Sequence, residues 1–246
     1  MSKDKVVVSN LTKRFKDLLV LDSISFSVKE GEFLCLVGPT GCGKTTFLNS
    51  LSKILTIDSG SITIDGEPVD PGKHNLAYIL QEYSTFPWLN VEQNIAYGLK
   101  IKGFDKATIA ERTQEAIGMV NLEKYRTYYP SELSASMLQR VVIARAFATK
   151  PDLLLMDEPY GQLDLNLKYK LEDELLKLWE QTKTTIIFIT HNIEEAIYLS
   201  DRILVMTNKP TTIKTSLPNN LERPRKVSSQ EFVDLRNKVT DLIKWW

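Results

Sequence analysis

The pattern of apolar positions divides the chain into short strands and longer helices. Continuous apolar runs of four to six residues are typical of buried strands, and after residue 150 they alternate with segments of helical spacing. Strands that alternate with helices predict a parallel sheet with right-handed crossovers. The predicted strands are Val6–Val8, Ile24–Val28, Phe33–Val37, Ser61–Ile64 with an Asp65-Gly66 hairpin turn, a short strand within His74–Leu80, Leu153–Met156, Thr185–Ile189 and Arg202–Met206.

Helices are predicted where apolar residues recur every three or four positions. Residues 88–150 have this spacing, which predicts a helical insertion in an α/β core, whereas residues 210–224 are expected to form an irregular surface connection. The predicted helix faces are Phe47, Leu48, Leu51, Ile54 and Leu55; Ile109, Ala116, Met119 and Val120 after a cap at Asp105; Val141, Ile143, Ala144, Ala146 and Phe147; Leu171, Leu175, Leu178 and Trp179 within 168–181; 193–199; and Phe232, Leu235, Val239, Leu242 and Trp246.

One stretch between a predicted strand and a predicted helix has the spacing of a phosphate-binding loop. Its glycines would let backbone N–H groups turn inward around an anion, and the following helix N-terminus adds partial positive charge. The lysine would reach the β- and γ-phosphates, and the first threonine after it would bind Mg²⁺. The pattern predicts a nucleoside triphosphate site without naming the reaction. The residues are Gly38, Pro39, Thr40, Gly41, Cys42, Gly43, Lys44, Thr45 and Thr46.

Two acidic residues follow a predicted buried strand. Asp157 would hold Mg²⁺ together with Thr45, and Glu158 would polarise a water for in-line attack on the γ-phosphate. The alternative is a pair of acids that cap a turn. The phosphate-binding loop upstream favours the catalytic interpretation.

Other candidate residues also fall at strand ends, where ligands bind in a parallel α/β sheet. His191 would contact the γ-phosphate and orient the water, and Gln81 would touch Mg²⁺ and the same water. Phe15 would stack on an adenine. The alternatives are a structural histidine, a surface amide and a core aromatic.

The composition of the chain limits which binding partners and which cellular compartment are expected. Lys+Arg and Asp+Glu both number 31, so bulk charge gives no reason to expect a nucleic-acid partner. No signal peptide or membrane-spanning run is predicted, and two cysteines suit a reducing cytosol. Cys42 lies near a helix N-terminus, which would lower its thiol pKa and make ATP binding sensitive to alkylation. The alternative is an inert small residue.

The motifs, and their order along the chain, resemble those of ABC transporter ATPase subunits. The resemblance covers essentially the whole chain. The resemblance implies a P-loop (RecA-like) α/β fold with an antiparallel β subdomain and a helical insertion. It implies an ATPase that uses ATP and Mg²⁺ at the cytoplasmic face of the membrane. This ATPase would dock on permease subunits, and a substrate-binding protein would deliver the solute to the permease. The residues that carry it are Phe15, 38–45, Gln81, Leu133-Ser134, Asp157-Glu158, Gly161-Gln162-Leu163-Asp164, whose Asp164 belongs to the dimer loop, and His191. On this basis we expect one domain, 1–246, with a core of 1–87 and 151–228, a helical subdomain of 88–150 and a C-terminal helix of 229–246.

Three segments narrow the resemblance to importers of nitrate, taurine, alkanesulfonates or bicarbonate. By the same resemblance, residues 82–100 lie where a coupling helix of the permease would insert; an internal packing turn is the alternative. The segments are Phe86-Pro87-Trp88-Leu89, Glu174–Trp179, and Val205-Met206 with Lys209-Pro210.

One motif departs from the family pattern of Leu-Ser-Gly-Gly. Here the stretch is Leu133-Ser134-Ala135-Ser136, so both glycines are replaced where a backbone would approach the phosphate of the opposite subunit. Poor geometry at one such contact would cost about 1–3 kcal/mol, or roughly one to two decades in rate. We therefore hypothesise a heterodimer with a second ATPase subunit. The rivals are an ATP-binding regulatory subunit with little turnover and a soluble ABC ATPase outside transport.

Overall fold

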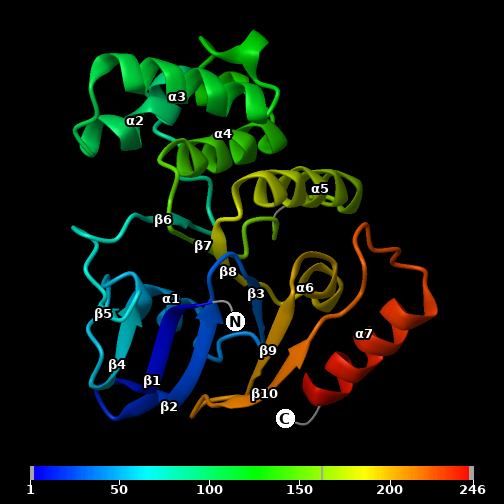
Figure 1. The fold of residues 1–246 in the computed structure, drawn as a ribbon. Coiled ribbons are helices and arrows are strands. Elements are labelled where there is room, and N and C mark those ends of the chain that lie inside the picture. Colours follow the sequence, from blue (N-terminus) through cyan, green and yellow to red (C-terminus); the bar gives the residue numbers. More distant parts are fainter. Residues whose placement is uncertain (1–2, 162, 244–246) are drawn as a thin grey trace. The chain divides into compact units, whose positions relative to one another are not determined.

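The structure, a computed structural model, describes residues 3–161 and 163–243 (Figure 1). Gln162 and the tail 244–246, which includes Trp246 of the predicted helix face, lie outside the described residues. The chain forms two compact units, Met1–His74 with Thr185–Trp246, and Asn75–Thr184. The first unit contains the predicted phosphate-binding loop, and the second contains the predicted acidic pair.

An antiparallel sheet makes up one part of the first unit. Its strands follow the order β2-β1-β4-β5, and the hairpin predicted at Asp65-Gly66 is confirmed between the last two. Both turn residues have positive φ, 54° and 86°, as a tight hairpin requires. The bounds are β1 (Asp4–Phe15), β2 (Leu18–Lys29), β4 (Ser59–Ile64) and β5 (Glu67–Pro68).

The other sheet of this unit contains the buried parallel strands. β3 (Phe33–Val37) lies between β8 (Thr185–Ile189) and β9 (Arg202–Met206), parallel to both, and every residue of β3 and β8 is buried. These three strands confirm the prediction from continuous apolar runs. β10 (Ile213–Pro218) pairs antiparallel with β9.

β10 shows that the prediction of an irregular surface connection over 210–224 is wrong. Ile213 and Thr215 are half-buried and Leu217 is buried, while the residues between them are exposed. This alternation is that of an edge strand. The three prolines and the low apolar content concealed it, because an edge strand buries only one side of its residues.

Three helices accompany these sheets: α1 (Lys44–Leu51), α6 (Ile193–Leu199) and α7 (Gln230–Ile243). The apolar face of α1 is confirmed for its first three members, which are buried, but Ile54 is 64% exposed and, like Leu55, lies beyond the helix end. α7 packs against α6 and β9 and buries Phe232 and Val239, so its predicted amphipathic face is confirmed within the described residues (Figure 1).

The second unit has two parallel strands and a long helix. β6 (Leu76–Ile79) pairs with β7 (Leu153–Asp157), and in this register Ile79 lies opposite Met156. α5 (Leu165–Thr182) follows β7. All four residues predicted to face inward from this helix are buried, which confirms its 3.6-residue pattern.

The rest of the second unit is a group of helices that pack pairwise: α2 (Val91–Ile101), α3 (Lys106–Met119) and α4 (Ala135–Ala148), with short turns η1 (Glu123–Tyr125) and η2 (Pro130–Glu132) (Figure 1). The Asp105 cap is confirmed, because its carboxylate accepts from the N–H groups of Ala107 and Thr108. Met119, expected on the buried face, is 38% exposed. The domain boundaries at 88 and 150 stay a prediction.

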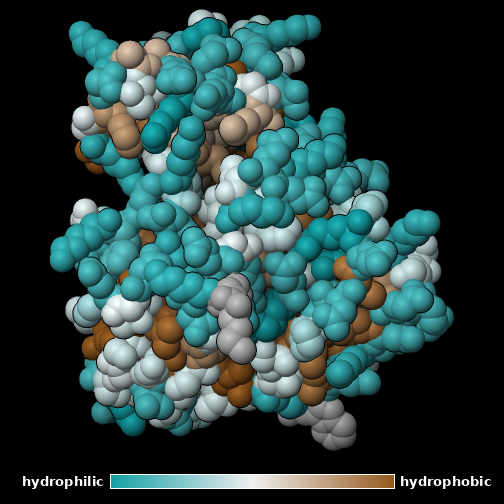
Figure 2. Space-filling model, viewed as in Figure 1, coloured by the Kyte–Doolittle hydropathy of each residue, from teal (hydrophilic) through white to brown (hydrophobic). Residues whose placement is uncertain are grey.

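The face of the helical group that Figure 2 shows is hydrophilic over much of its area and has several apolar patches. None of the helices within the described residues is both long and apolar enough to cross a membrane. Apolar residues of α2 and α4 pack these helices together, as the buried Ile95, Leu99, Val142 and Ile143 illustrate, although Ile101 at the end of α2 is 72% exposed.

A single buried amide fixes the segment that enters α2. Asn94 is fully buried, and its Oδ1 accepts from the Phe86 N–H at 2.8 Å. Its Nδ2 lies within hydrogen-bond distance of the carbonyls of Phe86, Leu89 and Asn90, at 3.1, 2.8 and 3.1 Å. The side chain therefore satisfies backbone groups of a turn that has no sheet partner.

We expect Asn94→Ala to destabilise the protein, because it would remove the acceptor of the Phe86 N–H and the donor to the Leu89 carbonyl and leave a cavity at a fully buried position. The expected loss is about 2–3 kcal/mol in the free energy of unfolding, measured by urea denaturation. Asn237→Ala, at an exposed position of α7, is the control and should change this free energy by less than about 0.5 kcal/mol. Equal effects of the two substitutions would contradict the structural role of Asn94.

Candidate functional site

The phosphate-binding loop joins the buried end of β3 to the N-terminus of α1, the context predicted for it. Gly41 and Gly43 have φ angles of 75° and 117°, which strain any residue with a Cβ. At Gly43 there is no space either, since a Cβ would lie 2.9 Å from Cγ1 of Val20 and 3.1 Å from Cδ2 of Leu21. The loop thus depends on glycine for its conformation and, at Gly43, for its packing on β2.

The Lys44 side chain lies against the loop itself. It is 5% exposed, and its ammonium donates to the carbonyls of Gly38 at 2.9 Å and Pro39 at 3.1 Å. The cation is therefore held beside the loop backbone, at the N-terminus of α1, where positive charge gathers. Thr40 and Thr45 are exposed, and Thr46 is half-buried.

The prediction that Cys42 has a lowered thiol pKa is wrong. The residue is 1% exposed, and burial raises its thiol pKa, although the nearby Lys44 charge acts in the opposite direction. Desolvation exceeds the effects of the Lys44 charge and of the backbone hydrogen bonds because the thiol packs inside the loop, where its Sγ would lie 3.2 Å from a Cβ at Gly38. The geometry matches an inert, buried thiol.

His191 lies beside the phosphate-binding loop along the sheet edge. β3 and β8 pair in parallel with Leu36 opposite Ile189, and the Thr190 N–H donates to the Leu36 carbonyl at 3.3 Å. Gly38 and His191 each follow this pair by two residues. His191 is exposed and directly precedes Asn192, the N-cap of α6.

In the second unit, the parallel register of β6 and β7 brings together Gln81, Asp157 and Glu158. Gln81 and Glu158 each lie two residues beyond the pair Ile79 and Met156. Asp157 is 4% exposed, whereas Gln81 is exposed. Glu158 is half-buried and has a φ of 45°, an uncommon value for a residue with a side chain and one that clusters at functional sites.

Tyr78 is a member of this second group that the sequence did not reveal. Burial raises its phenol pKa, and so do the charge of Asp157 and the hydrogen bond between the two side chains. A tyrosine that keeps its proton donates to the carboxylate. Tyr78 thus orients the buried acid at the end of β7. The sequence showed only an aromatic residue within a short predicted strand.

The segment that follows Gln81 is held by α4. Arg145 donates from Nη1 to the Ser84 carbonyl at 2.8 Å and from Nη2 to the Ser84 hydroxyl at 2.6 Å, and its guanidinium lies 5.3 Å from the ring centroid of Phe86. Burial lowers its pKa, but the guanidinium stays charged. Arg145 is a further residue that the sequence did not reveal.

Beside it, an aromatic cluster reaches the surface. The rings of Phe86 and Trp88 are 5.6 Å apart, those of Phe86 and Tyr97 are 4.4 Å apart, and Trp88 is 69% exposed. Phe86 itself is half-buried, so Trp88 is the exposed member of this pair.

The stretch with the altered glycines forms the beginning of α4. Ser134 is the N-cap and accepts from the Met137 N–H at 3.4 Å, and its hydroxyl lies 3.1 Å from that of Ser136. Ser134 and Ala135 are exposed. The N-terminus of a helix of 14 residues therefore faces solvent, with two hydroxyls beside it.

The two remaining predicted residues lie apart from these groups in the sequence. Phe15 ends β1, is 44% exposed, and has the Lys13 ammonium 5.3 Å from its ring centroid. Asp164 caps α5 by accepting from the Leu167 N–H at 3.1 Å and is exposed.

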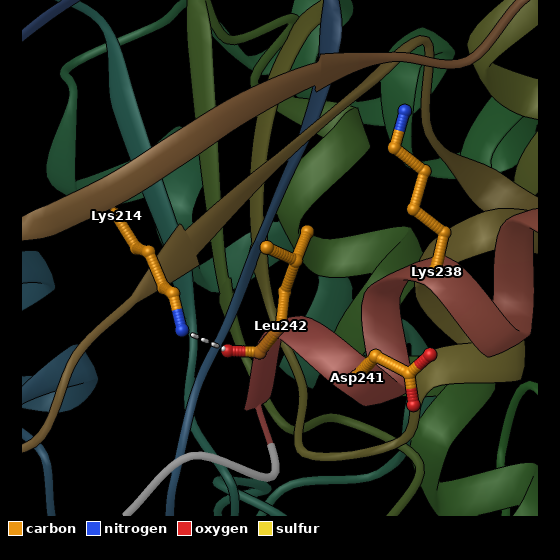
Figure 3. Close-up of a pocket in the computed structure, with 4 residues that line it drawn as sticks. All are labelled: Lys214, Lys238, Asp241 and Leu242. Atoms are coloured by element: carbon orange, nitrogen blue, oxygen red, sulfur yellow. Dashed lines mark hydrogen bonds between the residues drawn. The ribbon is translucent and has the colours of Figure 1, made fainter.

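A separate hollow of about 680 Å³ lies between β10 and α7 and is lined by Lys214, Lys238, Asp241 and Leu242. The Lys214 ammonium donates to the Leu242 carbonyl at 2.8 Å. The Lys238 side chain points away from this hydrogen bond (Figure 3). The two lysines do not converge on a common point. The hollow therefore lacks the arrangement expected of an anion site.

Comparison with known proteins supplies relatives over nearly the whole chain. The family model described as ABC transporter matches residues 21–161. An ATP-binding protein for import of aliphatic sulfonates (SsuB) from Bacillus anthracis is 44% identical over 220 residues, covering 89% of this chain and 86% of the relative. An uncharacterised ABC transporter ATP-binding protein from Methanocaldococcus jannaschii is 41% identical over 246 residues, covering 98% and 92%.

Solved structures agree on the fold. CbiO1 from Clostridium perfringens, described as part of an ABC transporter complex, superposes with a TM-score of 0.81 at 23% identity and covers 98% of each chain. A dimeric bacterial ABC transporter cassette superposes with a TM-score of 0.77 at 27% identity, covering 88% of this chain and 100% of that one. The predicted fold, a P-loop cassette with an antiparallel β subdomain, is confirmed.

If Asp157 holds Mg²⁺, as the sequence predicts, Tyr78→Phe should weaken Mg²⁺ binding in the presence of nucleotide by about tenfold, because the buried carboxylate loses the donor that orients it. Titration calorimetry with Mg²⁺ at saturating ADP measures the effect. Tyr125→Phe, which removes the same atom from an exposed side chain, is the control. Unchanged Mg²⁺ affinity in Tyr78→Phe would show that the hydrogen bond has no role at the metal.

Proposed function

Because this chain belongs to the ABC transporter family of ATP-binding proteins, we propose that it is the ATP-hydrolysing subunit of an importer for small anions. The observation that carries the import role is the 42–44% identity to several ATP-binding proteins for import of aliphatic sulfonates. An organic sulfonate is accordingly the first candidate substrate, followed by taurine, nitrate and bicarbonate.

ATP would bind with its phosphates in the loop 38–46. The positive φ angles of Gly41 and Gly43 leave backbone N–H groups free to point into the loop, and Lys44 places its charge beside them. Phe15, exposed at the end of β1, would stack on the adenine.

The donor set fits Mg²⁺. This ion keeps several waters and is bound through one or two carboxylates together with substrate phosphates, so it needs no cage of acids. Among the described residues there is no group of three or more histidine, cysteine and acidic side chains that would form such a cage. Asp157, oriented by Tyr78, with Thr45 and Gln81, would hold the ion, which would neutralise phosphate charge.

Hydrolysis would use the two remaining strand-end residues. Glu158 would accept a proton from the attacking water, and His191 would hold that water and the γ-phosphate in line. The positive φ of Glu158 fixes where its side chain leaves the backbone, which supports a positioned base.

Permease subunits are the proposed membrane partners. Trp88 and Tyr97 are exposed and pack on the half-buried Phe86, which forms an aromatic cluster of the kind that anchors protein interfaces. The segment that carries this cluster also follows Gln81, and Arg145 and Asn94 hold it firmly. The protein would then act at the cytoplasmic face of the membrane, and a substrate-binding protein would act through the permease.

A second ATPase subunit is the proposed partner in ATP hydrolysis. The exposed N-terminus of α4 would meet the γ-phosphate held by the other subunit, with Ser134 as the direct contact and Asp164 facing the same partner. The Cβ atoms of Ala135 and Ser136 would hinder that approach. A heterodimer in which the partner supplies a glycine-containing stretch would keep one efficient site.

The replacement of the two glycines by Ala135 and Ser136 also favours one alternative, an ATP-binding regulatory subunit with little turnover. It shares the phosphate-binding loop with the main proposal and differs only in the rate of hydrolysis. Addition of a partner ATPase separates the two: turnover that appears with the partner supports the ATPase, whereas ATP binding without turnover supports the regulatory subunit.

We expect the chain, reconstituted with its permease and partner ATPase, to hydrolyse ATP in a manner that depends on Glu158. Glu158→Gln should lower the rate at least about a hundredfold while ATP still binds, because the amide keeps the shape but accepts no proton. A phosphate-release assay measures the rate, and Glu180→Gln, at an exposed position of α5, is the control. An unchanged rate in Glu158→Gln would exclude it as the base.

We also expect the combined change Ala135→Gly and Ser136→Gly to raise the ATPase rate of the purified chain alone by about tenfold, because it removes two Cβ atoms at the phosphate contact. Ser134→Ala in the same background should reverse the gain by removing the hydroxyl. Full turnover of the unaltered chain alone would contradict the heterodimer.

A further inference from the structure

Thr211 lies at the turn between β9 and β10 and is fully buried, although its neighbours in the turn are exposed. Its N–H donates to the Val20 carbonyl at 2.9 Å, and its carbonyl accepts from the Asp22 N–H at 2.9 Å, which makes a single parallel bridge to β2 opposite Leu21. Its hydroxyl donates to the carbonyl of Cys42. One residue therefore connects β2 with the phosphate-binding loop.

The peptide that receives this hydroxyl is the one that enters Gly43. In a trans peptide the C=O and the N–H point in opposite directions. A donor that holds the Cys42 carbonyl on one side therefore sets the direction of the Gly43 N–H on the other side. N–H groups of such loops are the donors to bound phosphate.

Because Gly43 has no side chain, it offers this peptide little resistance to rotation. Gly43 rests against Val20 and Leu21, with a φ of 117°. The Thr211 hydroxyl is thus the side-chain contact that distinguishes one orientation of the Cys42–Gly43 peptide from the flipped one.

The turn that carries Thr211 is itself closed by hydrogen bonds. Thr207 and Thr212 pair through the Thr207 N–H and the Thr212 carbonyl at 3.0 Å, and the Thr207 hydroxyl accepts from the Thr212 N–H at 2.8 Å. The Thr212 hydroxyl faces that of Thr207 at 3.3 Å. Thr211 therefore approaches the loop from a support that does not depend on nucleotide.

We propose that Thr211 is a positioning residue for nucleotide binding: it holds the Cys42–Gly43 peptide so that the Gly43 N–H is presented to a phosphate. The inference rests on the proposed ATP-binding function and extends it to a residue outside the phosphate-binding loop. Thr211 itself touches no nucleotide and acts through the backbone of the loop.

The test compares three variants by titration calorimetry with ATP and with ADP. Thr211→Val keeps the shape and removes the hydroxyl, and it should weaken binding of both nucleotides about tenfold. Thr211→Ser keeps the hydroxyl and should bind within about twofold of the unaltered chain. Thr212→Val removes a hydroxyl from the same turn that faces Thr207, and it should also bind within about twofold.

The outcomes separate this inference from the proposed function. Failure of the unaltered chain to bind ATP would contradict the function itself. Normal ATP binding by both the unaltered chain and Thr211→Val would overturn the positioning role alone. A purely structural Thr211 would lower the melting temperature of Thr211→Val and leave its nucleotide affinity unchanged. Equally weak binding by Thr211→Ser would assign the effect to the methyl group and also overturn the inference.

If Thr211→Val does not fold, a crystal structure of the unaltered chain with ADP decides the question. The inference requires the Thr211 hydroxyl on the Cys42 carbonyl and the Gly43 N–H on a phosphate oxygen in the same structure. A flipped peptide, or a hydroxyl bonded elsewhere, would overturn it.

Discussion

The phosphate-binding loop depends on the contact between Gly43 and β2. A glycine with a φ of 117° lies where a Cβ would meet Val20, so the loop backbone can approach β2 only because that atom is absent. The antiparallel sheet that contains β2 is therefore part of the support for the loop, in addition to the parallel strand from which the loop emerges. Thr211 strengthens this support from the same side.

Buried polar side chains perform the corresponding task in the second unit. Asn94 and Arg145 bind the backbone of the segment after Gln81, and Tyr78 binds the carboxylate of Asp157. Burying such a polar group without a hydrogen-bond partner costs free energy, so a group that has its partner favours one conformation over the alternatives. The segment between β6 and α2 has no sheet to satisfy its backbone, so these side chains determine its conformation.

The sequence predicted the features that are local in the chain. The strand, loop and helix around 38–46 follow from adjacent residues, and the grouping of Gln81 with Asp157 follows from parallel strands that end together. Thr211 and Cys42 are 169 positions apart, and nothing local links them. Cys42 was misjudged because the charge of a helix N-terminus is visible in sequence, whereas desolvation of the thiol is not. β10 was missed because an edge strand has a weak apolar pattern.

The position of Lys44 has a consequence for the thermodynamics of the nucleotide-free chain. Lys44 is 5% exposed as a residue, and its ammonium donates to two backbone carbonyls, so these carbonyls have replaced much of its hydration when the protein folds. A phosphate bound in the loop, as proposed, would gain its attraction to this cation with little further dehydration, and salt would screen the pair only weakly. The cost of dehydrating the Lys44 ammonium is included in the free energy of folding, which lowers the stability of the nucleotide-free protein. Ligand binding to the folded state raises that stability by linkage.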